Sequence, residues 1–283
     1  MFAIDRFSGN QLAVLRSGDL LDEREMQKIA REINFSETAF ILSGRGDTYE
    51  VRIFTPVSEV PFAGHPTLGT AHVILKEILH DAGKALTLSL KVGKITVSCE
   101  GMEPGSPVYW MKQMDPQFGR RFSSQEIAPV LGIDAGHIDS RFPVEEVTTG
   151  LPHIIVPLIG AGALSGIRIR DREYGAFMSM WRGPLMAFCR ETRSPENQVS
   201  VRMFAPCLGV PEDPATGSGN GCLAGYLVRH RYFGTSSVNI RSEQGYDMGR
   251  PSLLHLKAEE INGRIDVTVG GTAITVARGE FLV

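Results

Sequence analysis

The order of apolar and polar residues predicts one helix followed by strands in the first part of the chain. Over residues 21–33 the apolar positions recur at helical spacing, and Asp22 and Glu23 stand in the first turn. The runs that follow have strand-like composition, and Val92-Gly93 joins two of them as a tight turn. These predicted strands cover residues 37–43, 49–55, 85–91, 94–100 and 108–113.

A break separates this part from the rest of the chain. Residues 114–121 contain Pro and Gly and are predicted to be a linker. Ser123 and Glu126 have the spacing of a capping box, which predicts a short helix ending near Gly132. Further helices are predicted over 66–79, 172–181 and 218–229. Further strands are predicted near 146 and over 153–157, 184–190, 199–205, 237–241, 253–258, 264–269 and 272–277.

Composition narrows the class of protein. A chain of 283 residues with 42% apolar residues can bury the core of one large or two medium domains. A net charge of −3 without long charged runs argues against nucleic acid or a membrane surface as the main partner. No apolar stretch approaches the ~18–20 residues that span a bilayer. Asp5 and Arg6 stand where a signal peptide would be apolar, so we expect a cytoplasmic protein.

The cysteines and the motif content imply no cofactor. Cys99, Cys189, Cys207 and Cys222 are widely scattered, and no Cys/His cluster has zinc-ligand spacing. Four cysteines in a chain of this length do not suggest a disulfide scaffold. The sequence also lacks a phosphate-binding fingerprint and a lysine context typical of pyridoxal enzymes.

The segment 209–221 carries the clearest chemical signal. Glu212 and Asp213 are followed by a turn rich in Gly, Thr and Ser, and the turn leads into an apolar, helix-like segment. Glycines let the backbone approach a ligand closely, and a helix N-terminus offers unpaired N–H groups to an anion. An acid beside such groups suits a site that moves protons on a carboxylate-bearing substrate.

The segment 60–75 repeats this plan. A Val-Pro pair leads to a titratable residue, His65, and then to Pro, Thr, Gly and an apolar helical run. Pro66 suits the first turn of a helix. Because the two copies lie about half a chain apart, we expect two similar halves with one site between them. In this interpretation, His65 and Asp213 introduce equivalent turns.

With these residues in view, the chain resembles the PhzF-type phenazine-biosynthesis proteins, a branch of the diaminopimelate-epimerase-like superfamily. The matching motifs follow the family's order over nearly the whole chain. They are FSGNQLAV at 7–14, NFSETAF at 34–40, RIFTP at 52–56, FAGHPTLG at 62–69, TGLPH at 149–153 and EDPATGS at 212–218.

The resemblance implies an α+β fold of the diaminopimelate epimerase type. Two pseudo-symmetric halves each wrap a curved, mostly antiparallel sheet around a central helix. We place the first half at 1–115, joined by a C-terminal strand at 272–283, and the second at 116–271. The active site is expected in the cleft between them. Because Met1 closely precedes Gly9, most of the family's first strand is expected to be shortened or absent.

The resemblance also implies catalytic roles for three residues. Glu37 takes the place of the family's proposed general base, although composition alone favours a solvent-facing strand carboxylate. His65 belongs to the site by resemblance, and a nearby helix N-terminus would favour its neutral form. Asp213 is implied to be a proton-handling or orienting acid, although Asp is also common at the start of helices.

A second group of residues is implied to bind substrate. Ser218 belongs to it, although serine also caps helices. Asn10 is a further candidate, and forming a turn with Gly9 is an equally good account of it. The remaining members are Gly64, Gly217 and Gly219. Among the other histidines, only His153, after Thr149-Gly150, is kept in reserve.

The sequence therefore predicts a cofactor-independent isomerase, and the resemblance adds an expected homodimer. It would remove a C–H proton from a small carboxylate-bearing metabolite and return a proton elsewhere on it; the phenazine-pathway member of the family isomerises a dihydro-hydroxyanthranilate. Two alternatives stay open: an epimerase or racemase with Glu37 and Asp213 as an unlike acid/base pair, and a non-catalytic small-molecule-binding protein. A two-thiol racemase is disfavoured because neither turn carries a cysteine before its helix, and Cys222 lies inside the second helix.

Overall fold

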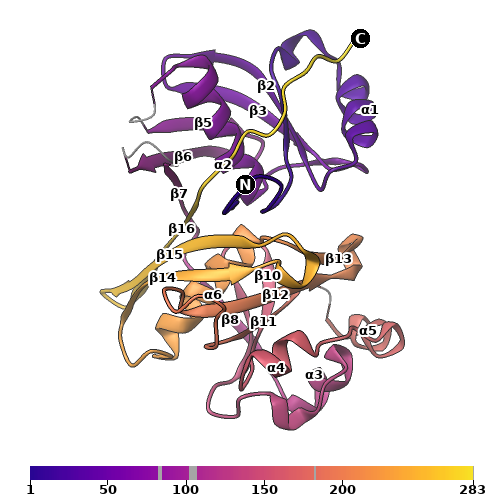
Figure 1. Cartoon of the computed structure of the whole chain (residues 1–283), viewed down its shortest axis with the longest axis vertical. Coiled ribbons are helices and arrows are strands. Elements are labelled where there is room, and N and C mark those ends of the chain that lie inside the picture. Colours follow the sequence, from indigo (N-terminus) through magenta and orange to yellow (C-terminus); the bar gives the residue numbers. More distant parts are fainter. Residues whose placement is uncertain (82–84, 102–106, 182, 283) are drawn as a thin grey trace. The chain divides into compact units, whose positions relative to one another are not determined.

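A computed structural model describes residues 1–81, 85–101, 107–181 and 183–282, and the chain divides into two compact units. The first unit is Met1–Met111 with Gly270–Val283, and the second is Lys112–Val269 (Figure 1). The sequence-based boundaries were placed at 115/116 and 271/272. Each unit combines a mixed sheet with helices, which is the predicted α+β class.

The first unit contains a mixed sheet in the order β1-β2-β3-β5-β6-β7, and the short strand β4 pairs with β3. The β1–β2 and β3–β5 pairs are parallel, and the β2–β3, β5–β6 and β6–β7 pairs are antiparallel. The strands are β1 (Ala13–Leu15), β2 (Thr38–Arg45), β3 (Thr48–Phe54), β4 (Glu59–Val60), β5 (Leu86–Leu90), β6 (Gly93–Glu100) and β7 (Val108–Lys112).

Two helices of different character belong to this unit. Helix α1 (Glu23–Ile33) starts at a capping box formed by Asp22 and Glu25, and its apolar face packs on β2 and β3. The residues of this small core are Met26, Ile29, Ala30, Phe40 and Phe54. Helix α2 (Gly64–Val73) is buried along most of its length and continues as a π-helical turn, Ile74–Ile78. It is therefore the central helix of the unit.

The second unit contains strands in the order β16-β15-β14-β12-β11-β10-β9-β8, and β13 pairs with β12. The β10–β11 and β12–β14 pairs are parallel. The strands are β8 (Gln117–Phe122), β9 (Val144–Thr148), β10 (Pro152–Pro157), β11 (Leu185–Cys189), β12 (Val199–Ala205), β13 (Val210–Asp213), β14 (Ser237–Gln244), β15 (Ser252–Ile261) and β16 (Arg264–Gly271). Its helices are α3 (Ser124–Leu131), α4 (Ala161–Ser165), α5 (Asp171–Met178) and α6 (Gly217–Arg229), and short 3-10 turns cover Gly18–Leu20, Ala135–His137, Pro206–Leu208 and Tyr246–Met248 in the two units.

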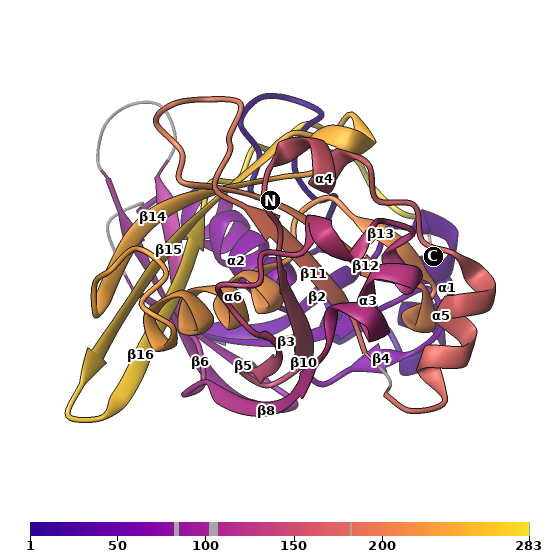
Figure 2. The same ribbon diagram turned by 90° about the horizontal axis from the view of Figure 1, so that it is seen from below.

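Successive side chains of β10 and β11 point to opposite faces of the sheet, and each face packs against different helices. Ile154 and Leu185 face a core shared with α3, α4 and α5. On the opposite face, Met186 and His153 lie against α6, and the ring of Phe188 packs 5.8 Å from that of Tyr226. Figure 2 shows α6 on one side of these strands and α3 and α5 on the other. Helix α6 is therefore the buried central helix.

The two units repeat one order of elements, as expected for the two similar halves predicted from the sequence. The first runs β1-α1-β2-β3-β4-α2-β5-β6, and the second runs β10-α5-β11-β12-β13-α6-β14-β15, with α4 as an addition. Each pair of strands in the first series has the same parallel or antiparallel sense as its counterpart in the second. In register, Val60 pairs with Ile53, and Asp213 pairs with Met203. Val60 and Asp213 therefore end equivalent strands.

Two predictions of secondary structure were wrong. The predicted linker at 114–121 contains most of β8, which follows Pro116 and pairs with β9. The predicted strand at 272–277 is not a strand; residues 272–282 are held by isolated bonds instead of a ladder. Phe2 N donates to the Thr272 carbonyl (2.7 Å), and the Thr275 hydroxyl lies 3.0 Å from His72 Nε2. Within the residues described, no helix combines the length and apolar character needed to cross a membrane.

Candidate active site

Glu37 and His65, two of the predicted catalytic residues, lie side by side in the first unit. Glu37 stands immediately before β2 with 20% of its side chain exposed, and His65 is the buried second residue of α2. His65 Nε2 lies 3.4 Å from Glu37 Oε2 and 3.1 Å from the carbonyl oxygen of Gln11. Because a carbonyl oxygen only accepts, Nε2 carries the hydrogen and is a donor.

Burial lowers the pKa of His65 to about 3, so the imidazole is neutral near neutral pH. A neutral ring with hydrogen on Nε2 leaves Nδ1 unprotonated. The pair is thus a carboxylate beside an uncharged imidazole, an arrangement in which the carboxylate can act as a base.

Asp213 lies in the second unit at the centre of a buried polar cluster. It ends β13, and the hydroxyl of Thr216, the residue before α6, donates to its Oδ2 over 2.5 Å. Gln244, at the end of β14, donates from Nε2 to the Asp213 carbonyl (2.8 Å) and to Thr216 Oγ1 (3.0 Å). Its Oε1 accepts from Thr216 N (3.1 Å) and Asn220 Nδ2 (2.9 Å).

Sequence reasoning missed Thr216, Asn220 and Gln244 as members of this cluster. Thr216 and Asn220 lie in the glycine-rich segment that was singled out, but the motif does not show where their side chains point. Gln244 is 31 residues from Asp213. No local pattern marks it, because a sheet pairing brings it there.

Glu212, the neighbour of Asp213, has a structural role. Arg202 binds it through Nε and Nη2, each at 2.8 Å, in a fork-to-carboxylate pair. The Arg202 side chain is buried, and its Nη1 donates to the carbonyl of Leu164. Of the two adjacent acids in the motif, Asp213 is therefore the one placed against the α6 turn.

The starts of α2 and α6 are similar, and neither is capped by a side chain. Ala63 precedes α2, and Thr216 precedes α6 with its hydroxyl directed to Asp213. Ser218 is therefore not the residue that caps α6. It is half-buried, and the described residues supply no hydrogen-bond partner for its hydroxyl. Gly64 and Gly217 are the first residues of their helices.

The helix starts also correct the predicted equivalence of His65 and Asp213. Counted from the first helical residue, His65 and Ser218 are both second in their helices. Asp213 ends the strand before α6, and Val60 stands at that place in the first unit. The predicted equivalence of His65 and Asp213 is therefore five residues out of structural register.

Asn10 and Gly219 are both closely packed against neighbouring residues. The Asn10 backbone exchanges two hydrogen bonds with Met1, each 2.8 Å, and the residue is buried. Its neighbour Gly9 has φ +71°, and a Cβ there would lie 2.3 Å from the Met1 carbonyl oxygen. Gly219, the third residue of α6, packs against Met186 and the ring of His153.

His153, kept in reserve from the sequence, is a buried residue beneath α6. Its Nδ1 lies 2.9 Å from the Leu151 carbonyl and 3.8 Å from Cys222 Sγ, and burial lowers its pKa to about 4. Burial also raises the pKa of the Cys222 thiol to about 11, so the sulfur stays protonated. This arrangement suits packing beneath the helix rather than thiol chemistry.

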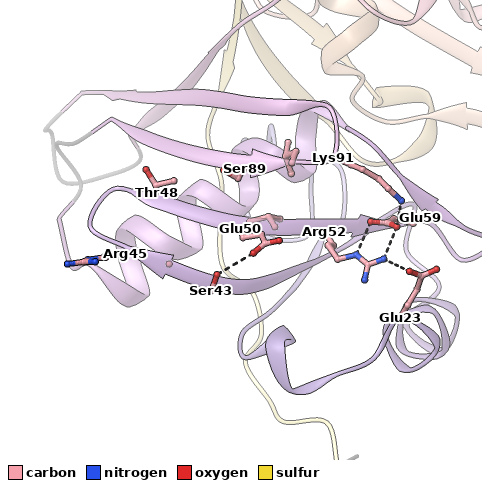
Figure 3. Close-up of a pocket in the computed structure, with 12 residues that line it drawn as sticks. Glu23, Ser43, Arg45, Thr48, Glu50, Arg52, Glu59, Ser89 and Lys91 are labelled. Atoms are coloured by element: carbon pink, nitrogen blue, oxygen red, sulfur yellow. Dashed lines mark hydrogen bonds and ion pairs between the residues drawn. The ribbon is translucent and has the colours of Figure 1, made fainter.

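A groove of about 810 Å³ on the first unit contains none of the predicted site residues (Figure 3). Four of its charged groups are bound to one another: Arg52 binds Glu59 at 2.8 Å and Glu23 at 2.7 Å, and Lys91 binds Glu59 at 2.7 Å. These partners, Arg52 first, lower the pKa of Glu59 to about 2. The Arg52 motif therefore ties β3 to β4 and α1. Over the ranges that the structure covers, no group of His, Cys, Asp and Glu is arranged to hold a metal ion.

Comparison with known proteins places this geometry in a family. The family model for phenazine biosynthesis-like proteins matches residues 1–279. The chain belongs to the phenazine biosynthesis-like protein family. It is 38% identical to a trans-2,3-dihydro-3-hydroxyanthranilate isomerase of Pseudomonas chlororaphis, over 98% of this chain and 95% of that protein.

Solved structures agree with this family assignment. The crystal structure of a phenazine biosynthesis protein of the PhzF family from Bacillus anthracis matches with a TM-score of 0.92 and 25% identity, over 100% of this chain and 96% of that one. A probable proline racemase from Agrobacterium radiobacter, 11% identical, matches with a TM-score of 0.60 over 93% and 82% of the two chains and shows the shared fold. The predicted fold is confirmed, and this member of the family is an isomerase.

Proposed function

We propose that this phenazine biosynthesis-like protein is a cofactor-independent isomerase that moves a proton on a small carboxylate-bearing metabolite. Glu37 is the general base of this proposal. The observation that carries it is the 3.4 Å approach of Glu37 Oε2 to His65 Nε2, on a neutral imidazole. A carboxylate next to a neutral hydrogen-bond donor accepts a proton more readily than one held in a tight ion pair.

The reaction is a proton transfer with a shift of a double bond. Glu37 takes a proton from a carbon that is activated by a neighbouring unsaturated or carbonyl group. A proton then returns to another carbon of the same molecule, so that atoms and charge balance. Asp213 and Ser218 act on the same substrate in this proposal, with Asp213 handling or orienting a proton. Gly64, Gly217, Gly219 and Asn10 shape the substrate-binding turns.

The name of the Pseudomonas chlororaphis relative supplies a first substrate to test. Trans-2,3-dihydro-3-hydroxyanthranilate carries a carboxylate and a double bond next to it. The purified protein should convert this compound, or another small unsaturated carboxylate from a panel, to an isomer that NMR identifies. An inverted stereocentre without a shifted double bond would favour an epimerase, and binding without any conversion would favour a binding protein.

Binding of the ligand, followed by protein NMR, tests whether Glu37 and Asp213 act on one substrate. A bound ligand should change the NMR signals of residues next to Glu37 and next to Asp213. Changes at only one of the two would oppose a shared substrate. A homodimer and a cytoplasmic location remain predictions from the sequence.

A further inference from the structure

The polar cluster at the α6 turn has only one consistent arrangement of hydrogens. The Thr216 backbone N–H can only donate, and the Asp213 backbone carbonyl can only accept. Because Gln244 Oε1 lies 3.1 Å from the first and Nε2 lies 2.8 Å from the second, the orientation of the amide is determined. Both hydrogens of Nε2 and both acceptor positions of Oε1 are used.

This orientation determines the direction of the next hydrogen bond. Gln244 Nε2 donates to Thr216 Oγ1 over 3.0 Å, so the hydroxyl is an acceptor toward the amide. Its own hydrogen points to Asp213 Oδ2 at 2.5 Å. A carboxylate oxygen that receives a hydrogen bond of this kind is stabilised in its charged form.

The first unit is an internal comparison for this cluster. Val60 occupies the place of Asp213, and Ala63 precedes α2 as Thr216 precedes α6. Glu50 lies three residues before Ile53 in β3 and pairs with Ser89. Likewise, Ser200 lies three residues before Met203 in β12 and pairs with Glu243. Leu90 therefore stands where Gln244 stands.

The two helices nonetheless share one side-chain bond at this turn. The Thr67 hydroxyl donates to the Ala63 carbonyl over 2.7 Å, and Asn220 Nδ2 donates to the Thr216 carbonyl over 3.0 Å. The fold thus builds the turn and this bond with Ala63 and Leu90 in place. Thr216 and Gln244 are therefore not needed to form this turn. They occur in the second unit, where the strand before the helix ends in the carboxylate of Asp213.

We infer that Thr216 and Gln244 are positioning residues that hold Asp213 as a carboxylate with Oδ2 occupied, so that a proton passing through Asp213 sits on Oδ1. This inference rests on the proposed function only in giving Asp213 a proton to handle. The charged groups on the neighbouring strand and turn are already paired: Glu212 binds Arg202, and Asp247 lies 3.9 Å from the same guanidinium. The Thr216 hydroxyl is the contact through which this cluster acts on Asp213 Oδ2.

The test replaces the hydroxyl without changing the shape of the side chain. In Thr216→Val, the pKa of the Asp213 carboxyl, followed by carbon NMR without substrate, should rise by about 1–2 pH units, since hydrogen bonds to charged groups are worth about 1.5–3 kcal/mol. Thr216→Ser keeps the hydroxyl and should restore the original value. Thr67→Val, which removes the equivalent hydroxyl in the first unit, should leave the Asp213 value unchanged.

Each outcome decides the inference. An Asp213 pKa that is unchanged in Thr216→Val, or shifted equally in Thr67→Val, overturns it. If Thr216→Val does not fold, Thr216→Ala replaces it, because Ala63 already occupies this position in the first unit. The lower limb of the pH profile of kcat/KM should move with the NMR value. A shifted NMR value in a protein that converts no substrate would retain the positioning role and reject the isomerase proposal.

Discussion

His65 Nε2 lies 3.4 Å from Glu37 Oε2, and the ring that carries it is neutral. The hydrogen bond of this N–H goes to the Gln11 carbonyl at 3.1 Å, so the ring stands beside the carboxylate as an uncharged neighbour. An uncharged ring stabilises the charge of a nearby carboxylate less than a cation does. A carboxylate beside a neutral imidazole suits the role of a general base.

Glu37→Gln should therefore strongly reduce turnover and preserve the fold. Glutamine keeps the shape of the side chain beside His65, but it cannot take a proton. We expect a loss of about 10²–10⁴-fold in rate, measured with the substrate that wild type converts. Thermal unfolding should change little.

Glu50→Gln is the matched control for this substitution. Glu50 is an exposed carboxylate of β3, and its Oε2 accepts a hydrogen bond from the Ser43 hydroxyl at 3.4 Å. Its replacement should leave turnover and unfolding as in wild type. Aggregation of the Glu37→Gln protein would show that the carboxylate has a structural role. Full activity of this variant would show that the carboxylate is not needed for the reaction.

The stability of the protein should fall on acidification because of His153. Burial lowers its folded-state pKa to about 4 from 6.5, so the unfolded chain binds the proton first. The free energy of unfolding is unaffected by this group above pH 6.5 and decreases as the pH drops from there toward 4. The loss is roughly 3 kcal/mol for a change of this size, and chemical denaturation at several pH values measures it.

His153→Asn should flatten this pH dependence. The asparagine amide can still donate to the Leu151 carbonyl as Nδ1 does, and it does not titrate. His137→Asn, at an exposed position, should leave the slope unchanged. Buried His65 and His72 act in the same direction, so a residual slope is expected. An identical slope in wild type and His153→Asn would contradict this account.

Two glycine-to-alanine substitutions in helices of the second unit should have opposite effects. At Gly219 in α6, a Cβ would lie 2.3 Å from Met186 Cε and 3.1 Å from the His153 ring, so overpacking should destabilise the protein by about 1–3 kcal/mol. At Gly175 in α5, a Cβ would meet no atom within 4 Å, so Gly175→Ala should stabilise it by about 0.5–1 kcal/mol. Urea unfolding of both variants measures the difference, and equal effects would refute the packing argument.

Local signals explain which parts of the fold were predictable from the sequence. The capping box of Ser123 and Glu126 involves residues three apart, so the start of α3 could be located, and helical spacing of apolar residues located α1. Strand β8 was taken for a linker because Pro116 and Gly119 break the local pattern, while pairing with β9 is what makes it a strand. Residues 272–277 have strand-like composition but no ladder partner.

The candidate site shows the same division between local and distant information. Glu37 and His65 were named from motifs, but their 3.4 Å contact depends on β2 packing beside α2, which no motif encodes. Gln244 could not be named, because its role depends on the parallel pairing of β14 with β12. The misalignment of His65 with Asp213 arose because equal dipeptides need not occupy equal places in a repeated fold.

Proton exchange with solvent distinguishes two ways in which Glu37 can act. If the base exchanges its proton with water between removal and return, turnover in heavy water should place deuterium on carbon in the product or in recovered substrate. If the site shields the proton and returns the same one, incorporation should be low although conversion is complete. Glu37→Gln should show neither conversion nor exchange in both cases. A wild-type protein that binds a ligand but neither converts it nor exchanges its protons would leave no role for Glu37 as a base, and the proposed isomerisation of that ligand would be rejected.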